Sequence, residues 1–312
     1  MKAQRPATPL PTSDVARIQA ALAAGNDREA LRLASAWPPP SPTSAPTRRP
    51  SRAAGRPSCV LRCIGRWGGM WRRWSRRALL RSRNDMLPDP VIEMHEGFMV
   101  VRDDILPGGT KRRAIHALFD DRPEYVYASP VYGYAQVALA HAARDHGREA
   151  TIFCAKRKEH APLTKQAIAA GATVIEVPHG YLSVVTARAR EYCKTVNAKL
   201  LPFGLDDPLF IEALAAVVRQ MDVAPFEVWT ACGSGALTRA LQLAWPAARF
   251  VGVKVGSAPN AGRAEVIAAP ERYEQPAYFL PPFPSCPNYD AKVWRFMKAN
   301  ARPGALFWNV AS

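Results

Sequence analysis

The stretch that decides the fold is PGGTKRR at residues 107–113, which follows VVRDD at residues 100–104. The valines favour a strand, the two glycines favour a tight turn, and a helix is expected over residues 112–119. Lys111 therefore stands where that helix should begin. The dipole at the start of a helix disfavours a cation, so this placement points to a role for Lys111 other than helix formation.

Beyond Met86, short apolar stretches alternate regularly with segments of helical pattern. Strands are expected at residues 125–128, 150–154, 172–177, 199–203, 227–230 and 249–253, and helices at residues 135–146, 162–170, 184–197, 207–223 and 237–244. Helices of this length between short apolar strands are typical of βαβ units. The sequence therefore predicts an α/β fold with parallel sheets flanked by helices.

A second glycine-rich turn, TACGSGALT at residues 230–238, lies between a predicted strand and a predicted helix. Small side chains let a ligand approach the backbone closely, and the N–H groups at a helix N-terminus favour an anion. Tight packing of the strand against the helix would explain the same residues. Both interpretations stay open from the residues alone.

A third segment is CPNYDAKVW at residues 286–294, followed by ALFWNV at residues 305–310. Taken by itself, it predicts a turn at Pro287-Asn288 and a helix whose first turn holds Asp290, where the dipole favours a carboxylate. A final strand is expected near residues 305–310.

The three segments, in this order, resemble the fold-type II pyridoxal-phosphate enzymes (the tryptophan synthase β-like superfamily). They are most similar to the branch of 1-aminocyclopropane-1-carboxylate deaminase and D-cysteine desulfhydrase. The resemblance implies that Lys111 holds pyridoxal 5'-phosphate as a Schiff base and later acts as a base at the substrate Cα. It places Tyr289 at the reacting centre and Asp290 against the ring nitrogen. It assigns the cofactor phosphate to the second turn, with Gly233, Ser234, Gly235, Ala236 and Leu237.

The Schiff base requires a neutral lysine, so burial or neighbouring cations should lower the pKa of Lys111. Arg112 and Arg113 are the candidate cations.

The chain departs from the family at SPVYGYAQ, residues 129–136. The family has an asparagine here that contacts the phenolic oxygen of the cofactor, and its neighbours bind the substrate carboxylate. This chain has Gly133 at that position, and the candidate substrate-binding residues are Ser129, Tyr132, Gly133 and Tyr134. The two tyrosines either open space for a large or planar substrate or pack beneath the sheet.

The resemblance implies a lyase or deaminase-like enzyme that acts at Cα of an amino acid or amine. Two alternatives remain. One is a phage-type decarboxylase or lyase whose substrate is an amino-acid-modified pyrimidine in DNA. The other is a protein that binds pyridoxal phosphate without catalysis.

Charge divides the chain into a basic leader over residues 1–85 and a catalytic domain over residues 86–312. The leader holds 17 Lys/Arg and 4 Asp/Glu, whereas the remainder holds 25 and 22. The nearly neutral domain thus has no nucleic-acid footprint by charge. The leader is expected to be helical over residues 13–36 and disordered over residues 37–58. Residues 59–85 interleave Arg with Trp, a pattern that can bind nucleic acid or an anionic surface. We nevertheless expect this segment to be a poorly ordered basic tail. At 227 residues the domain is short for the family, which implies a trimmed two-lobe architecture.

The six cysteines show no disulfide or zinc spacing, and the six histidines are scattered, so no metal is expected. No apolar run reaches the length of a membrane span. We therefore expect a cytoplasmic protein with free thiols. Relatives are commonly dimers, so the resemblance also implies a homodimer.

Overall fold

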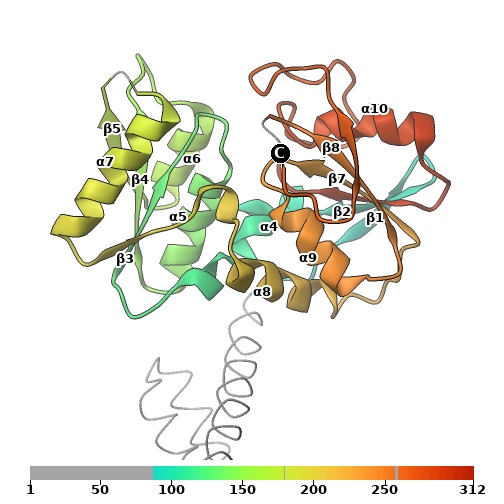
Figure 1. Cartoon of the computed structure of the whole chain (residues 1–312), viewed down its shortest axis with the longest axis horizontal. Helices are drawn as coiled ribbons and strands as arrows, with labels where there is room; N and C mark the ends of the chain where they lie inside the picture. The colour runs from blue at the N-terminus through green and yellow to red at the C-terminus, as the bar shows by residue number, and fades with distance from the viewer. Residues whose placement is uncertain (1–86, 179, 257–258) are drawn as a thin grey trace, which may run out of the picture. The chain divides into compact units, whose positions relative to one another are not determined.

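The structure, a computed structural model, describes residues 87–178, 180–256 and 259–312. The predictions for the leader over residues 1–85 lie outside these residues, as does a domain start at Met86. The described residues hold two sheets, one of six strands and one of four, each flanked by helices (Figure 1). The predicted α/β class with parallel sheets is confirmed.

The four-stranded sheet is entirely parallel, in the order β5-β4-β3-β6. Its strands are β3 (Glu124–Ala128), β4 (Glu149–Ala155), β5 (Thr173–Val177) and β6 (Ala198–Leu200). Residues 150–154 of β4 are all buried, as expected for a strand covered on both faces.

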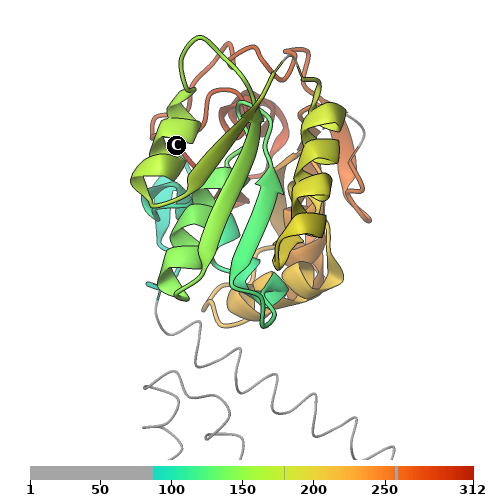
Figure 2. The same ribbon diagram turned by 90° about the vertical axis from the view of Figure 1, so that its left-hand side faces the viewer.

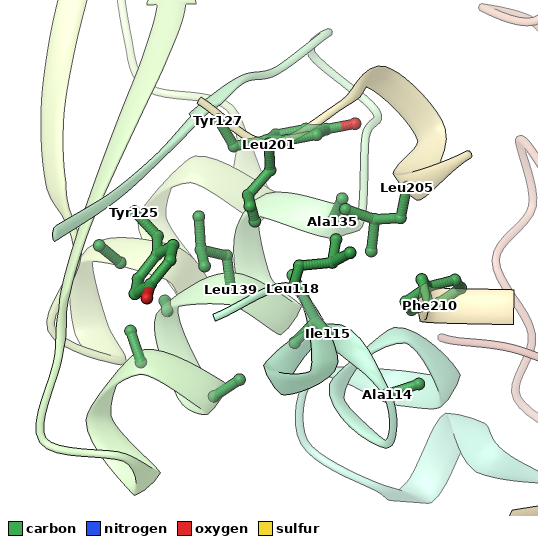
Figure 3. Close-up of a cluster of buried hydrophobic side chains, with 14 of the residues drawn as sticks. Ala114, Ile115, Leu118, Tyr125, Tyr127, Ala135, Leu139, Leu201, Leu205 and Phe210 are labelled. Atoms are coloured by element: carbon green, nitrogen blue, oxygen red, sulfur yellow. The ribbon is translucent and has the colours of Figure 1, made fainter. Parts of the chain in front are cut away.

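Helices cover both faces of this sheet (Figure 2). One face carries α5 (Ala135–Asp145) and α6 (Pro162–Ala169), and the other carries α7 (Leu182–Thr195). The core on the α5 side joins Tyr125 and Ile152 from the strands to Leu139 from α5, all of them inaccessible to solvent. Figure 3 shows Tyr125 and Leu139 in this cluster.

The six-stranded sheet has the order β1-β2-β10-β7-β8-β9. Its strands are β1 (Ile92–His95), β2 (Phe98–Arg102), β7 (Glu227–Cys232), β8 (Arg249–Lys254), β9 (Glu265–Ala268) and β10 (Leu306–Asn309). Only the edge strand β1 is antiparallel to its neighbour. One face packs against α10 (Ala291–Asn300), and the other packs against α8 (Pro208–Val218) and α9 (Ala236–Ala244).

Each sheet contains one point where the strand order reverses. The chain runs outward from β3 through β4 to β5 and returns to place β6 on the other side of β3. It likewise runs from β7 through β8 to β9 and returns to place β10 on the other side of β7. Ligands of open parallel sheets bind outside the carboxyl ends of the strands at such points. The loops after β3, β6, β7 and β10 are therefore the expected place for a site.

The prediction of a helix over residues 112–119 is wrong. The segment forms a short helix α4 (Gly109–Arg112) and then a 3₁₀ turn η2 (Ile115–Leu118). Arg113 still has right-handed helical φ and ψ, and the helical path ends at Ala114, whose φ is −131°. The Arg113 guanidinium donates to Asp103 (2.8 Å) and to the Pro88 carbonyl (2.7 Å).

Four further elements differ from the prediction. The strand expected at residues 199–203 ends at Leu200, and a 3₁₀ turn η3 (Phe203–Leu205) follows it. The helix expected over residues 207–223 ends at Val218. The strands β1 and β9 were not predicted, because their exposed residues interrupt any apolar run.

In the part of the chain that the structure describes, no helix combines the length and apolar character needed to cross a bilayer.

Candidate active site

The lysine turn lies directly against the end of β10. Gly108 and Gly109 have φ of 91° and 63°, a left-handed conformation that glycine adopts without steric cost. A Cβ on Gly109 would collide with the carbonyl oxygen of Val310. The Thr110 N–H donates to that same oxygen (3.2 Å), and the indole N–H of Trp308 donates to Thr110 Oγ1 (2.8 Å). These contacts fix the turn, and with it Lys111, to the central strand.

Buried ion pairs hold the segment that precedes the turn. Asp104 accepts two hydrogen bonds from Arg102, at 2.8 and 2.9 Å. Asp103, which is inaccessible to solvent, pairs with Arg113 at 2.7 Å. Bidentate arginine–carboxylate pairs are both strong and geometrically specific. The Arg-Asp-Asp segment therefore shapes the turn.

Burial lowers the pKa of Lys111, which favours the neutral amine. Asp290 and Cys286 act in the opposite direction and stabilise the ammonium form. The expected contribution of Arg112 and Arg113 is not found. Arg112 pairs with Asp145 at 2.7 Å, and Arg113 pairs with Asp103. The cause of the lowered pKa is loss of solvent.

Tyr289 and Asp290 precede α10 and approach the lysine turn from the opposite side. The Nζ of Lys111 lies 6.0 Å from the centroid of the Tyr289 ring. The Tyr289 hydroxyl accepts a hydrogen bond from the Gly233 N–H at 2.8 Å. A Cβ on Gly233 would come within 2.8 Å of this hydroxyl oxygen. Glycine at position 233 thus permits the contact between the second turn and Tyr289.

Asp290 is fully buried, and only one of its two carboxyl oxygens has a hydrogen-bond partner among the described residues. Its Oδ2 accepts from the Ala311 N–H at 3.2 Å, whereas its Oδ1 has no hydrogen-bond partner among the described residues. Burial raises the pKa of Asp290 to about 8, although the nearby Lys111 acts to lower it. The carboxyl group is therefore largely protonated at neutral pH.

The second turn is held in place by contacts from both sheets. The Ser234 hydroxyl donates to the Gly204 carbonyl (3.1 Å) in the loop after β6. Gly235 has φ of 87° and lies so close to the Asn260 carbonyl that a Cβ would not fit. Within residues 87–178, 180–256 and 259–312, no acceptor is found for the N–H of Ser234 or Gly235. Two N–H groups thus remain available beside the start of α9.

These elements enclose a cavity of about 380 Å³. Its wall includes residues from the loops after β3, β6, β7 and β10, where the strand order of each sheet reverses. The predicted site residues that line it are Lys111, Tyr132, Gly133, Tyr134, Gly233, Ser234, Tyr289 and Asp290. Gly235, Ala236 and Leu237 line a narrower pocket that shares Lys111, Ser234 and Tyr289 with the cavity. Ser129 does not line the cavity and faces a different one.

Sequence reasoning missed other wall residues of this cavity, chiefly Tyr127, Phe203, Gly204, Tyr273 and Cys286. Cys286 begins the third segment, so its proximity to Tyr289 was the available signal. Burial raises the pKa of its thiol to about 11.

No sequence signal marked Tyr273, which long-range contacts bring to the site. Its carbonyl accepts from Asn288 Nδ2 (3.3 Å), and the fully buried Lys292 donates to the adjacent Arg272 carbonyl (2.8 Å).

The glycine at position 133 is a steric requirement of its loop. A Cβ there would lie 2.9 Å from two ring carbons of Pro130 and 3.0 Å from Ser129 Oγ. The buried Gln136 donates to the Gly133 carbonyl at 3.0 Å and accepts from Thr164 at 3.1 Å. An asparagine side chain at position 133 therefore does not fit this loop.

The two tyrosines beside Gly133 face the cavity. The ring of Tyr132 meets that of Tyr273 edge to face, with centroids 6.0 Å apart. Tyr134 lines the cavity and also packs within 3.2 Å of the position that a Gly109 Cβ would take. The tyrosines thus shape the space beside Lys111.

No group of three or more His, Cys, Asp or Glu side chains suited to a metal ion is found among the described residues.

No protein-family model and no curated protein matches the sequence. Solved structures do match the fold. An ACC deaminase homologue superposes with a TM-score of 0.61 and 16% identity, covering 72% of this chain and 90% of that chain. Diaminopropionate ammonia lyase from Escherichia coli superposes with a TM-score of 0.56 and 13% identity, covering 76% of this chain and 87% of that chain. O-Acetylserine-dependent cystathionine β-synthase from Helicobacter pylori superposes with a TM-score of 0.52 and 15% identity, covering 74% of this chain and 95% of that chain. The described part of this chain therefore has the fold of the fold-type II pyridoxal-phosphate enzymes.

Proposed function

We propose that the protein is a pyridoxal-phosphate-dependent lyase or deaminase that acts at Cα of an amino acid or related amine. The observation that carries the proposal is one cavity lined both by Lys111, whose pKa is lowered by loss of solvent, and by the fully buried Asp290, whose Oδ1 has no hydrogen-bond partner among the described residues. Lys111 is the residue that binds the cofactor covalently.

The polar groups of the cavity match the cofactor. A buried polar atom without a partner costs about 1–3 kcal/mol, so Asp290 Oδ1 is poised for a polar ligand atom, which the pyridine nitrogen supplies. The N–H groups of Ser234 and Gly235, beside the start of α9, suit the phosphate. Lys111 lines both the cavity and the narrower pocket that contains Gly235.

When bound, pyridoxal phosphate withdraws electrons from the bonds at the substrate Cα. The side chains supply the rest of the chemistry. Loss of solvent keeps Lys111 uncharged at a lower pH than a surface lysine, so its Nζ is a nucleophile and, once free, a base for the Cα proton. Burial raises the pKa of Tyr289 well above its usual value, so its phenol stays protonated as a hydrogen-bond donor. The Gly233 N–H fixes the position of that phenol.

The test begins with the absorption spectrum of the protein after addition of pyridoxal phosphate. We expect a band at the violet edge of the visible, and borohydride reduction followed by peptide mass mapping should place the reduced cofactor on Lys111. Lys111→Ala should abolish both results. Lys165→Ala removes an exposed lysine elsewhere on the domain and should abolish neither. A colourless protein, or a label on another residue, would overturn the proposal.

The same preparation separates the two alternatives raised by the sequence. Exchange of the Cα hydrogen of free amino acids with solvent supports the proposed activity. A normal band without such exchange favours a non-catalytic binding protein. Turnover of amino-acid-modified DNA but of no free amine favours a DNA-modifying enzyme.

A further inference from the structure

Tyr127 brings a buried hydroxyl group to the wall of the cavity beside Lys111. It is the last residue but one of β3, it is only 2% exposed, and it lines the cavity of about 380 Å³. Figure 3 shows its ring in the core on the α5 side, with the hydroxyl pointing away from Tyr125 and towards the segment that carries Leu205. The chemistry proposed above gives this hydroxyl no role.

The hydroxyl of Tyr127 accepts a hydrogen bond but donates none to the described part of the chain. The Gly204 N–H donates to its oxygen at 3.2 Å, and no acceptor for its own proton is found among residues 87–178, 180–256 and 259–312. A phenol can both accept and donate, and a buried polar group that lacks a partner is unfavourable. The proton of Tyr127 therefore remains available to an acceptor inside the cavity.

This hydroxyl stays a donor throughout the neutral pH range. Burial raises the pKa of Tyr127 to about 12, although the hydrogen bond from Gly204 acts to lower it. A hydrogen bond to a charged acceptor is roughly twice as strong as one between neutral groups. A buried, uncharged donor thus favours an anionic oxygen of a ligand.

The residue that fixes this hydroxyl also contacts the second turn. Gly204 lines both the cavity and the narrower pocket. Its carbonyl accepts from the Ser234 hydroxyl at 3.1 Å, and a Cβ on Gly204 would lie 2.6 Å from Ser234 Cβ. Tyr127 is therefore joined through one residue to the turn whose Ser234 and Gly235 N–H groups have no acceptor among the described residues.

The ligands of the proposed function contain two anions with several equivalent oxygens. One is the phosphate of the cofactor, which the second turn suits, and the other is the carboxylate of an amino-acid substrate. Each anion accepts more hydrogen bonds than two backbone N–H groups supply. A further uncharged donor at the cavity wall matches either of them.

Resting on the proposed function, we propose that Tyr127 binds an oxyanion inside the cavity through its hydroxyl. The Gly204 N–H fixes the phenol oxygen, and the phenol proton is donated to an oxygen of the bound ligand. Tyr127 is thus a binding residue for the cofactor phosphate or for the substrate carboxylate, and the affinities below decide between the two.

The experiment uses Tyr127→Phe, which removes the hydroxyl and keeps the ring. Cofactor affinity is measured by equilibrium dialysis with pyridoxal phosphate and with pyridoxal, which lacks the phosphate. Substrate affinity is measured on the cofactor-loaded protein, from the spectral change with L-alanine and with ethylamine, which lacks the carboxylate. Each comparison is a ratio within one variant, so a general change in the cavity cancels.

The two ratios identify the partner. If the phosphate accepts from Tyr127, Tyr127→Phe should lower the preference for pyridoxal phosphate over pyridoxal by about 10 to 100 times, the range for a hydrogen bond to a charged group. If the carboxylate accepts, the preference for alanine over ethylamine should fall by the same factor, and the cofactor preference should not change. Wild-type ratios in both comparisons would overturn the inference.

Tyr125→Phe is the matched control. Tyr125 faces the same side of β3 two residues earlier, and its hydroxyl donates to the Asp120 carbonyl at 2.8 Å, outside the cavity. Urea unfolding should show a loss of stability in Tyr125→Phe, whereas both preferences should keep their wild-type values. If the wild-type protein takes up the cofactor on Lys111 and Tyr127→Phe keeps both ratios, only this inference falls. Failure of the wild-type protein to take up the cofactor would overturn both proposals.

Discussion

Replacement of Gly109 by alanine tests whether the lysine turn depends on its close contact with β10. Gly109 has φ of 63°, and an alanine in this left-handed conformation costs about 1–2 kcal/mol. Its Cβ would also collide with the Val310 carbonyl, which cannot move freely because Val310 directly follows the central strand. Overpacking of this kind costs about 1–3 kcal/mol more. We therefore expect Gly109→Ala to lower the free energy of unfolding by about 2–5 kcal/mol in total.

The chain offers a matched control for the conformational part of this cost. Gly147 has φ of 60°, and a Cβ there would meet no atom within 4 Å. Gly147→Ala should therefore lose only about 1–2 kcal/mol. Urea unfolding followed by tryptophan fluorescence measures both variants. Only Gly109→Ala should also reduce borohydride trapping of pyridoxal phosphate on Lys111, because only that turn positions the lysine. Equal losses of stability in the two variants would refute the reasoning.

Three further substitutions probe the site. The pKa of Asp290 is about 8 in the folded protein against 3.8 for a free carboxyl, so the folded state binds this proton more tightly. The free energy of unfolding of the cofactor-free protein should therefore fall as the pH rises from 3.8 towards 8, by at most about 1.4 kcal/mol per unit. Asp290→Asn should flatten that profile in urea titrations, and an unchanged slope would contradict the assignment. Thr110→Val leaves the buried indole N–H of Trp308 without its acceptor and should cost about 1–3 kcal/mol, whereas Thr110→Ser should restore most of the loss in the same titrations. Gly133→Asn forces the Pro130 ring to move and should destabilise the protein by about 1–3 kcal/mol. A gain in cofactor affinity by equilibrium dialysis would show that the loop can accept the asparagine.

Periodicity and turn chemistry predicted the strand and helix alternation well where the elements are buried. Strands such as β4 and β7 are covered on both faces, so their apolar runs are continuous and visible in the sequence. The edge strands β1 and β9 keep exposed residues and give no such run. The helix expected over residues 112–119 is interrupted at Ala114, whose φ of −131° is not helical. Alanine is a strong helix former, so propensity gives no sign of this break.

The candidate site likewise contains some residues that local sequence patterns predicted and others that they did not. The small-residue turn and the lysine turn are local patterns, and the resemblance placed them together in one pocket. Tyr127 and Tyr273 were missed because they reach the cavity through long-range packing with no local motif. Ser129 lines the neighbouring cavity and not the one beside Lys111, which the linear pattern of residues 129–136 does not reveal.

The position of β10 links the lysine turn to the order in which the polypeptide is made. This strand lies between β2 and β7, and the residue that follows it anchors the lysine turn about two hundred positions earlier in the chain. A nascent polypeptide lacks that anchor until synthesis has passed residue 310. Until then β2 has no parallel neighbour on the side where β10 later pairs with it. Pairings between distant segments form slowly and leave strands exposed in the meantime. During synthesis, competence to hold the cofactor should thus arise late and abruptly rather than growing with chain length.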